Sequence, residues 1–141
     1  MTVASTTLCV QISEKELDGA SNWYSTSVST YANLTGLNSL TSNSSVTAST
    51  SKTSAGGQDT VTITLNNTSA TNIAFFMRPE VTAGNNGLEV VPVTYTDNYV
   101  SLFPGESITI TAKYATTDLG GQSPSLRIRG YNVPQFLIPI P

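Results

Sequence analysis

Apolar and polar residues alternate with a period of two along most of the chain after residue 44, and this pattern restricts the possible folds more than any other feature. In the run 60–69, for example, Val61, Ile63 and Leu65 alternate with threonines. Such alternation is typical of β-strands that have one face on a core and the other in solvent. Seven segments are predicted strands, most of them on this basis: 45–50, 60–69, 73–81, 88–95, 107–114, 125–131 and 136–141.

Turn residues separate these runs. The pairs and clusters that mark turns are Gly56-Gly57, Asn66-Asn67, 84–87, Pro104-Gly105 and Gly120-Gly121. Short strands between frequent turns are typical of an antiparallel β-sandwich, here of about seven strands. Segment 73–81 is apolar on both faces and is predicted to be central, whereas Pro92 places 88–95 at an edge or a bulge.

The first part of the chain has a different pattern. We expect residues 1–42 to form an N-terminal extension and connecting segment, and residues 43–141 to form the sandwich. Within 22–40 the apolar residues Tyr31, Leu34, Leu37 and Leu40 are three apart, which indicates a helical turn or an irregular segment.

Composition excludes several classes of function. The chain has 6 Lys+Arg against 9 Asp+Glu, so it lacks the basic patch that nucleic-acid binding requires. It contains no histidine and a single cysteine, Cys9, which excludes histidine-based triads, histidine-ligated zinc and cysteine-based metal sites. No apolar run is long enough to span a membrane. No cofactor is predicted.

Four ordered stretches resemble a known family: NWYSTSVSTYANLTGLNSL (22–40), AGGQDTVTITLNNTS (55–69), DNYVSLFPGESITITAKY (97–114) and DLGGQSPSLRIRGYN (118–132). Together they resemble the C-terminal immunoglobulin-like domain of exo-β-D-glucosaminidases, or exo-chitosanases, of glycoside hydrolase family 2. The resemblance covers about residues 13–135. Residues 1–12 resemble nothing in this family.

This resemblance implies an immunoglobulin-like fold and a place in a larger secreted, extracellular enzyme. Such enzymes release glucosamine from the non-reducing end of chitosan oligosaccharides, and their catalytic carboxylates lie on a TIM barrel upstream of this domain. The barrel is absent from this sequence, so no catalytic residue is carried over. The resemblance thus predicts a non-catalytic accessory domain whose partner is the TIM-barrel domain, with chitosan or glucosamine oligosaccharides as a further candidate partner.

Two alternatives remain beside this interpretation: a free-standing carbohydrate-binding module and an adhesion or self-association sandwich. A carbohydrate-binding module would need aromatic rings that stack on sugars, and the candidates are Trp23, Tyr24, Tyr99, Phe103 and Tyr131. Under the docking interpretation, Asp97 and Asn98 satisfy backbone groups, while Tyr99 and Phe103 supply apolar area next to the Pro-Gly turn.

The acidic and amide residues allow further hypotheses of lower weight. Asp97 and Glu106 flank an aromatic cluster, but we interpret both as turn and strand-end residues rather than as a catalytic pair. Loop oxygens of Asn85, Asn86, Glu89, Asp97 and Asn98 could bind calcium, although their spacing matches no EF-hand. Candidate N-glycosylation sites are Asn33, Asn43, Asn66 and Asn67.

Overall fold

The structure is a computed structural model that describes residues 33–141. Residues 40–141 form a compact unit, and residues 33–39 belong to a separate one. The latter contains the short 3-10 helix η1 (Thr35–Ser39), before which Asn33 Oδ1 accepts a hydrogen bond of 3.0 Å from Thr35 N. A 3-10 helix repeats every three residues, so around Leu37 the chain has the helical turn that was one of the two structures expected within 22–40.

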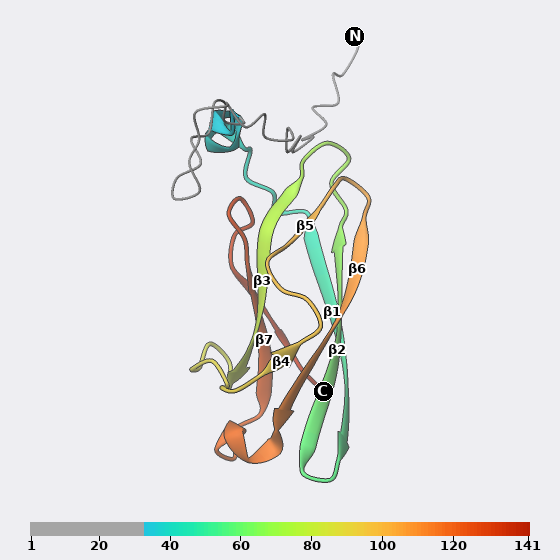
Figure 1. Ribbon diagram of the computed structural model, residues 1–141, viewed down its shortest axis with the longest axis vertical. Helices are drawn as coiled ribbons and strands as arrows, with labels where there is room; N and C mark the ends of the chain where they lie inside the picture. The colour runs from blue at the N-terminus through green and yellow to red at the C-terminus, as the bar shows by residue number, and fades with distance from the viewer. Residues whose placement is uncertain (1–32) are drawn as a thin grey trace, which may run out of the picture. The chain divides into compact units, whose positions relative to one another are not determined.

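Residues 40–141 form a sandwich of two four-stranded antiparallel sheets (Figure 1). In the first sheet, the order is β1 (Val46–Ala55), β2 (Gln58–Asn67), β6 (Ser107–Ala115) and β4 (Thr94–Tyr95). In the second, the order is β5 (Val100–Leu102), β3 (Ala74–Ala83), β7 (Pro124–Arg129) and β8 (Phe136–Pro139). A second 3-10 helix, η2 (Thr116–Leu119), joins β6 to the loop before β7.

This architecture confirms the predicted all-β, immunoglobulin-like sandwich, with eight strands where about seven were expected. The first sheet has the strand order of the ABED sheet in immunoglobulin constant-type domains. The second sheet places β5 beside the three strands that correspond to CFG. As predicted, the strand formed by segment 73–81 is central, because β3 lies between β5 and β7.

The expected strand over 88–95 is wrong for most of its length. Only β4 (Thr94–Tyr95) is a strand there, at the edge of the first sheet, while Glu89 makes an isolated bridge to Thr82. The chain leaves one sheet and joins the other within this segment, so no continuous ladder forms. Conversely, the short strand β5 (Val100–Leu102) was not anticipated, because three residues are too few to show alternation.

Two glycine turns have the geometry that their sequences predict. Gly56 and Gly57 have φ values of 59° and 77° and connect β1 to β2, as a two-residue type I′ hairpin requires. Between β5 and β6, Gly105 has a φ of 78° after Pro104, and Glu106 N donates to Phe103 O at 3.1 Å. This second turn therefore has the Pro-Gly geometry of a type II turn.

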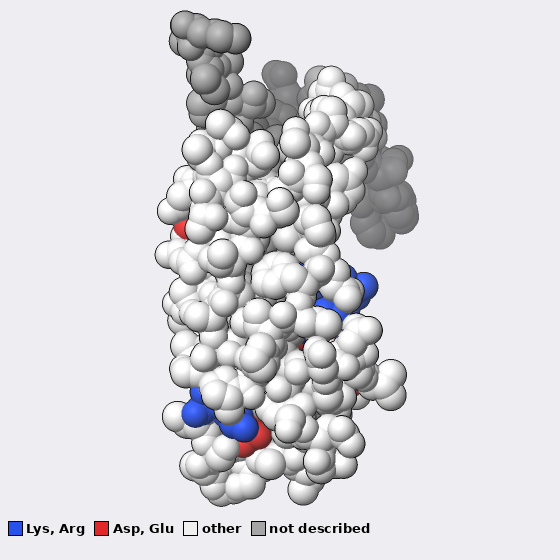
Figure 2. Space-filling view, turned by 180° about the vertical axis from the view of Figure 1, so that it is seen from behind, with Lys and Arg blue, Asp and Glu red and all other residues white. Residues whose placement is uncertain are grey.

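Inward-facing residues of both sheets make up most of the core, and the alternation predicted most of these strand residues correctly. Val61, Ile63 and Leu65 of β2 are fully buried, as are Leu126 and Ile128 of β7. The surface is correspondingly poor in charge: most of the face drawn in Figure 2 is uncharged, with small blue and red areas. Within residues 33–141, no helix has the length and apolar character needed to cross a membrane.

Candidate functional site

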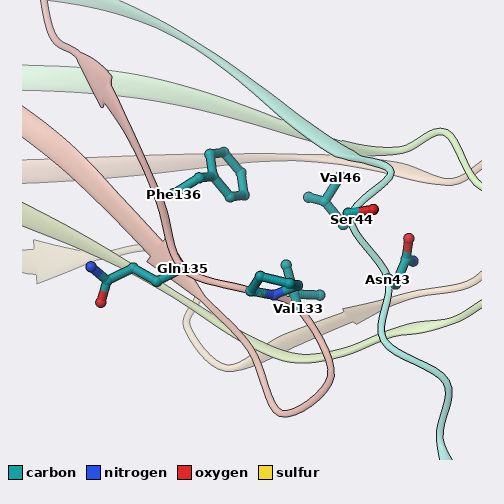
Figure 3. Close-up of a pocket in the computed structure, with 7 residues that line it drawn as sticks. Asn43, Ser44, Val46, Val133, Gln135 and Phe136 are labelled. Atoms are coloured by element: carbon teal, nitrogen blue, oxygen red, sulfur yellow. The ribbon is translucent and has the colours of Figure 1, made fainter.

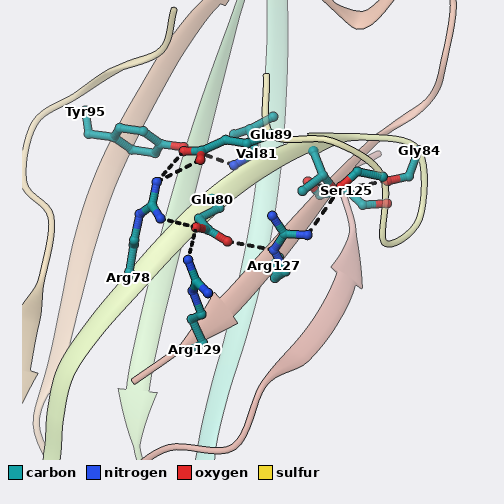
Figure 4. Close-up of polar contacts among 11 residues, drawn as sticks. Arg78, Glu80, Val81, Gly84, Glu89, Tyr95, Ser125, Arg127 and Arg129 are labelled. Atoms are coloured by element: carbon teal, nitrogen blue, oxygen red, sulfur yellow. Dashed lines mark hydrogen bonds and ion pairs between the residues drawn. The ribbon is translucent and has the colours of Figure 1, made fainter. Parts of the chain in front are cut away.

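A buried carboxylate lies at the centre of the most unusual feature of the described chain. Glu80 is on β3 and has no solvent exposure. Its Oε2 accepts a hydrogen bond of 2.6 Å from Arg127 Nε, and its Oε1 accepts one of 2.9 Å from Arg129 Nη2. Arg78 forms a third ion pair with the same carboxylate. Figure 4 shows the three guanidinium groups converging on Glu80.

Strand register explains why these charges meet. Glu80 pairs with Arg127, and Arg78 pairs with Arg129, in the antiparallel ladder between β3 and β7. Side chains two residues apart on a strand share a face, so all four lie on the face of the sheet opposite the core. The sequence correctly predicted that Arg127 and Arg129 face outward. It missed Glu80, because the pairing of β3 with β7 is set by contacts far apart in the chain.

A second carboxylate extends this cluster into the loop after β3. Arg78 Nη2 donates to both oxygens of Glu89, at 2.8 and 2.7 Å. Arg127 also donates from Nη1 to the carbonyl oxygen of Gly87 at 3.2 Å. The ion cluster, defined as Arg78, Glu80, Glu89, Arg127 and Arg129, therefore fixes the loop 84–90 against the sheet (Figure 4).

The surroundings of Glu80 determine its charge. Burial by itself raises the pKa of this carboxyl group, but the hydrogen bond from Arg127 and the charges of Arg78, Arg127 and Arg129 lower it more. The net effect is a pKa below the usual value for glutamate. Glu80 therefore remains a carboxylate at neutral pH and is unsuited to donate a proton.

Four aromatic rings form a continuous row near the ion cluster. Tyr131 packs edge-on against Phe75 with ring centroids 6.0 Å apart, Phe75 lies 5.2 Å from Phe76, and Phe76 lies 5.6 Å from Tyr99. The Arg78 guanidinium carbon lies 5.9 Å from the centre of the Tyr99 ring. Phe76, Tyr99 and Tyr131 are 52%, 51% and 60% exposed, so most of this aromatic row faces solvent.

Two members of the aromatic row have strained backbones. Phe76 has a φ of 55° and Tyr99 a φ of 54°. This region is costly for bulky side chains, by about 1–3 kcal/mol each. At Phe76 the strain accompanies a break in the ladder between Ala74 and Met77. A residue inserted at such a bulge turns side chains away from the core, which explains why neither Phe75 nor Phe76 is buried.

Local hydrogen bonds hold these strained residues in place. Phe76 N donates to Ser101 Oγ at 3.1 Å, and Tyr99 N donates to Asn98 Oδ1 at 2.9 Å. Asn98 N in turn donates to Asp97 Oδ1 at 2.7 Å. Asp97 and Asn98 thus satisfy backbone groups beside Tyr99, as the docking interpretation of the sequence expects.

The predicted residues at the Pro-Gly turn lie nearby in the chain. Phe103 is 45% exposed, and its backbone N donates to Glu106 Oε2 at 2.8 Å. Glu106 therefore holds the turn together. Sequence reasoning treated Glu106 as a solvated strand-end residue and missed this capping contact.

Other candidates are placed differently. Trp23 and Tyr24 lie outside the described residues, as does Cys9. Both Glu89 oxygens face Arg78, which leaves that carboxylate engaged rather than available to calcium. Within residues 33–141, no group of three or more Asp, Glu, His or Cys side chains is placed to hold a metal ion.

Two of the four candidate glycan sites are buried. Asn43 and Asn67 are each 1% exposed, and Asn43 Nδ2 donates to Asn67 Oδ1 at 3.0 Å. Asn67 Nδ2 donates to the carbonyl oxygens of Asn72 and Leu102, at 2.8 and 3.0 Å. A glycan would replace a hydrogen of these enclosed amides, so the folded domain argues against both sites. The exposed Asn33 and the half-buried Asn66 stay predictions.

A third buried asparagine fixes the segment that leads into β1. Asn132 Nδ2 donates to Thr41 O at 2.9 Å and to Ile73 O at 2.8 Å, while Asn43 N donates to Asn132 O at 2.7 Å. Beside these contacts lies a shallow hollow of about 310 Å³, lined by Asn43, Ser44, Val46, Val133, Pro134, Gln135 and Phe136 (Figure 3). It contains no charged side chain and offers little to a ligand.

Comparison with known proteins gives this geometry a context. Residues 23–133 match the model of the exo-β-D-glucosaminidase Ig-fold domain family. The exo-β-D-glucosaminidase of Amycolatopsis orientalis is 42% identical over 121 residues, which are 86% of this chain and 12% of that protein. The corresponding proteins of Streptomyces avermitilis and Arthroderma benhamiae are 37% and 34% identical, and the matches cover 84% and 85% of this chain and 13% of each relative.

Solved structures agree with these matches. The crystal structure of the Amycolatopsis orientalis exo-chitosanase CsxA is 44% identical and superimposes with a TM-score of 0.72 over 86% of this chain and 14% of that one. A complex of a variant of this exo-chitosanase with PNP-β-D-glucosamine gives a TM-score of 0.73, with the same identity and coverage. The chain thus spans about one eighth of the relatives that it matches. It belongs to the family of exo-β-D-glucosaminidase Ig-fold domains.

Proposed function

We propose that this chain is the non-catalytic accessory domain of a secreted exo-β-D-glucosaminidase that acts on chitosan oligosaccharides. The observation that carries the proposal is the match of residues 23–133 to a domain that makes up only 12–14% of its relatives. In this proposal, the chemistry belongs to the remainder of the enzyme, a TIM-barrel domain by resemblance, and this domain supports it by packing against it.

The contacts of the carboxylates within residues 33–141 support a non-catalytic role. A retaining glycosidase needs two carboxyl groups about 5–5.5 Å apart, one of them with a raised pKa. Glu80 has a lowered pKa and is enclosed by arginines. Glu89 is held by both oxygens, and Glu106 and Asp97 accept backbone hydrogen bonds.

Asp59, a further buried carboxylate, also has structural partners. It is 1% exposed, and its Oδ1 accepts hydrogen bonds from the hydroxyl groups of Ser54 and Thr116, at 2.6 and 3.1 Å. A carboxylate enclosed in this way cannot reach a glycosidic bond. Five of the six described carboxylates therefore have a structural contact that accounts for them.

A domain exchange tests the proposal. Residues 23–141 of this chain would replace the matching segment of the Amycolatopsis orientalis enzyme, and a second form of that enzyme would lack the segment altogether. We expect the isolated chain to release no glucosamine from chitosan oligomers. The exchanged enzyme should be soluble and active, whereas the shortened form should lose solubility or activity.

Two results would contradict this function. One is turnover by the isolated chain that disappears in Asp97→Asn. The other is an exchanged enzyme that performs no better than the shortened form, since a true accessory domain of this family should substitute for its 44% identical counterpart.

A further inference from the structure

We propose that the aromatic row of Phe75, Phe76, Tyr99 and Tyr131, flanked by Arg78, is the surface by which this domain docks onto the remainder of the enzyme. The inference rests on the proposed function and identifies the docking surface and the chemistry of its partner. The partner surface should contain apolar hollows for Phe76, Tyr99 and Tyr131, and carboxylate groups opposite the neighbouring arginines.

Two of the exposed rings lie at backbone positions that suit smaller residues better. Phe76 and Tyr99 are half exposed, and both have a positive φ that glycine or asparagine would adopt with less strain. Strain of this kind is typical of binding surfaces, where the side chain serves a partner rather than the fold.

The residue types and the charge of the proposed docking surface indicate what kind of partner binds there. Aromatic residues and arginine are the residue types most enriched at the energetic centres of protein interfaces. The adjacent ion cluster holds three arginines against two glutamates, so it has a surplus of one positive charge. The side chain of Arg129 is 52% exposed and retains hydrogen-bond donors for a second carboxylate.

A saccharide fits this surface less well. Sugar rings stack on flat aromatic faces, but the planes of successive rings in the row are inclined by 82°, 38° and 48°. Rings at such angles offer no common plane for a chain of pyranose units. A glucosamine oligomer also carries ammonium groups, which the surplus positive charge of the ion cluster disfavours.

The size of the relatives favours an occupant from the same polypeptide. The matched domain accounts for 12–14% of each relative, so most of the protein lies beside it on one chain. Tethering makes the contact intramolecular and raises its effective concentration. A row of a few exposed rings can then form a stable contact that would be too weak between separate molecules.

The experiment uses two substitutions that remove exposed rings of the aromatic row. Phe76→Gly and Tyr99→Gly each delete an aromatic side chain and relieve the strain at a positive φ. In the isolated 141-residue chain, the double variant should melt at or above the temperature of the parent chain. Leu88→Asn serves as the control, because Leu88 is 86% exposed and lies outside the row.

The same substitutions are then made in the domain-exchanged enzyme. We expect the rate of heat inactivation to rise at least fivefold in the double variant and to stay within twofold of the parent in Leu88→Asn. If the double variant also stays within twofold, the docking surface is wrong while the proposed function stands. If the exchanged enzyme without substitutions performs no better than the shortened form, both the function and the surface are wrong.

Three further results would overturn the inference. A clear fall in the melting temperature of the isolated double variant would show that the aromatic row stabilises the domain itself. If calorimetric titration with a glucosamine hexamer gives a heat of binding that vanishes in the double variant, the aromatic row is a sugar-binding site instead. If the isolated chain forms a discrete dimer and the double variant does not, the aromatic row binds a second copy of this chain instead.

Discussion

Glu80 Oε2 lies 2.6 Å from Arg127 Nε on the neighbouring strand, and the Glu80 side chain is nevertheless fully shielded from solvent on the face of the sheet opposite the core. Two more arginines, Arg78 and Arg129, and a second carboxylate, Glu89, complete this cluster. A charge taken out of water in this way is tolerated only while all of its partners stay in place. The cluster therefore joins β3, β7 and the loop 84–90 into one unit.

Replacing this carboxylate should destabilise the domain strongly. In Glu80→Gln the three arginines lose their shared counter-ion, so we expect the free energy of unfolding to fall by about 3–5 kcal/mol. Urea unfolding followed by fluorescence measures this change. Glu106→Gln is the matched control, because Glu106 is exposed and a glutamine oxygen can still accept from Phe103 N. A loss below about 1 kcal/mol in Glu80→Gln would show that the cluster contributes little.

The same cluster predicts a pH dependence. The folded-state pKa of Glu80 is lowered from 4.5, so its stabilising contribution is complete above pH 4.5 and is lost as the pH falls through the folded pKa. The difference in unfolding free energy between the parent and Glu80→Gln should therefore shrink only below that pH. Denaturant titrations from pH 7 to pH 3 measure it. A difference that already shrinks between pH 7 and pH 5 would mean that the pKa is raised instead.

Gly87 should tolerate no side chain. A Cβ atom at this position would overlap the carbonyl oxygen of Ala83 and lie 2.9 Å from its carbonyl carbon. Gly87→Ala must therefore displace the loop 84–90, and with it the hydrogen bond that Arg127 makes to Gly87 O. We expect a loss of about 1–3 kcal/mol in unfolding free energy, in the range of other steric changes in packed regions. Gly121→Asn, at an open turn with a φ of 80°, should cost far less.

Asn132 should be more important for stability than its polar character suggests. Its side chain donates to two carbonyl groups and accepts from Phe75 N, so Asn132→Ala leaves three backbone groups without this partner. Each buried group left unpaired costs about 1–3 kcal/mol. Thermal unfolding should show a clear fall in melting temperature, and a change of less than about 2 °C would contradict the role of Asn132 as an anchor.

Glycan placement follows from the same buried amides. If the chain is expressed through a eukaryotic secretory pathway, peptide mass spectrometry should find Asn43 and Asn67 unmodified. Any glycan should be at Asn33 or Asn66, whose side chains reach solvent. Substantial occupancy at Asn67 would mean that modification precedes folding and that the buried network in this structure does not form.

Local sequence patterns were enough to predict most of the strands and most of the core. Period-two alternation in β2 and β6, and turn residues such as Gly56-Gly57, act over a few neighbouring residues, so they can be recognised without knowledge of the fold. The resemblance to the family added the immunoglobulin-like topology. The exposure of Tyr99 and the backbone-capping roles of Asp97 and Asn98 were also accessible at this level.

Which charged and aromatic residues meet depends on long-range strand pairing, which the sequence patterns do not specify. Glu80 and Arg127 are 47 residues apart in the chain, and their contact depends on a strand register that no local pattern specifies. The approach of Phe76 to Tyr99 depends on a bulge in one strand and an unanticipated three-residue partner strand. Such contacts arise from the pairing of distant segments, whereas alternation reports only which way each side chain faces.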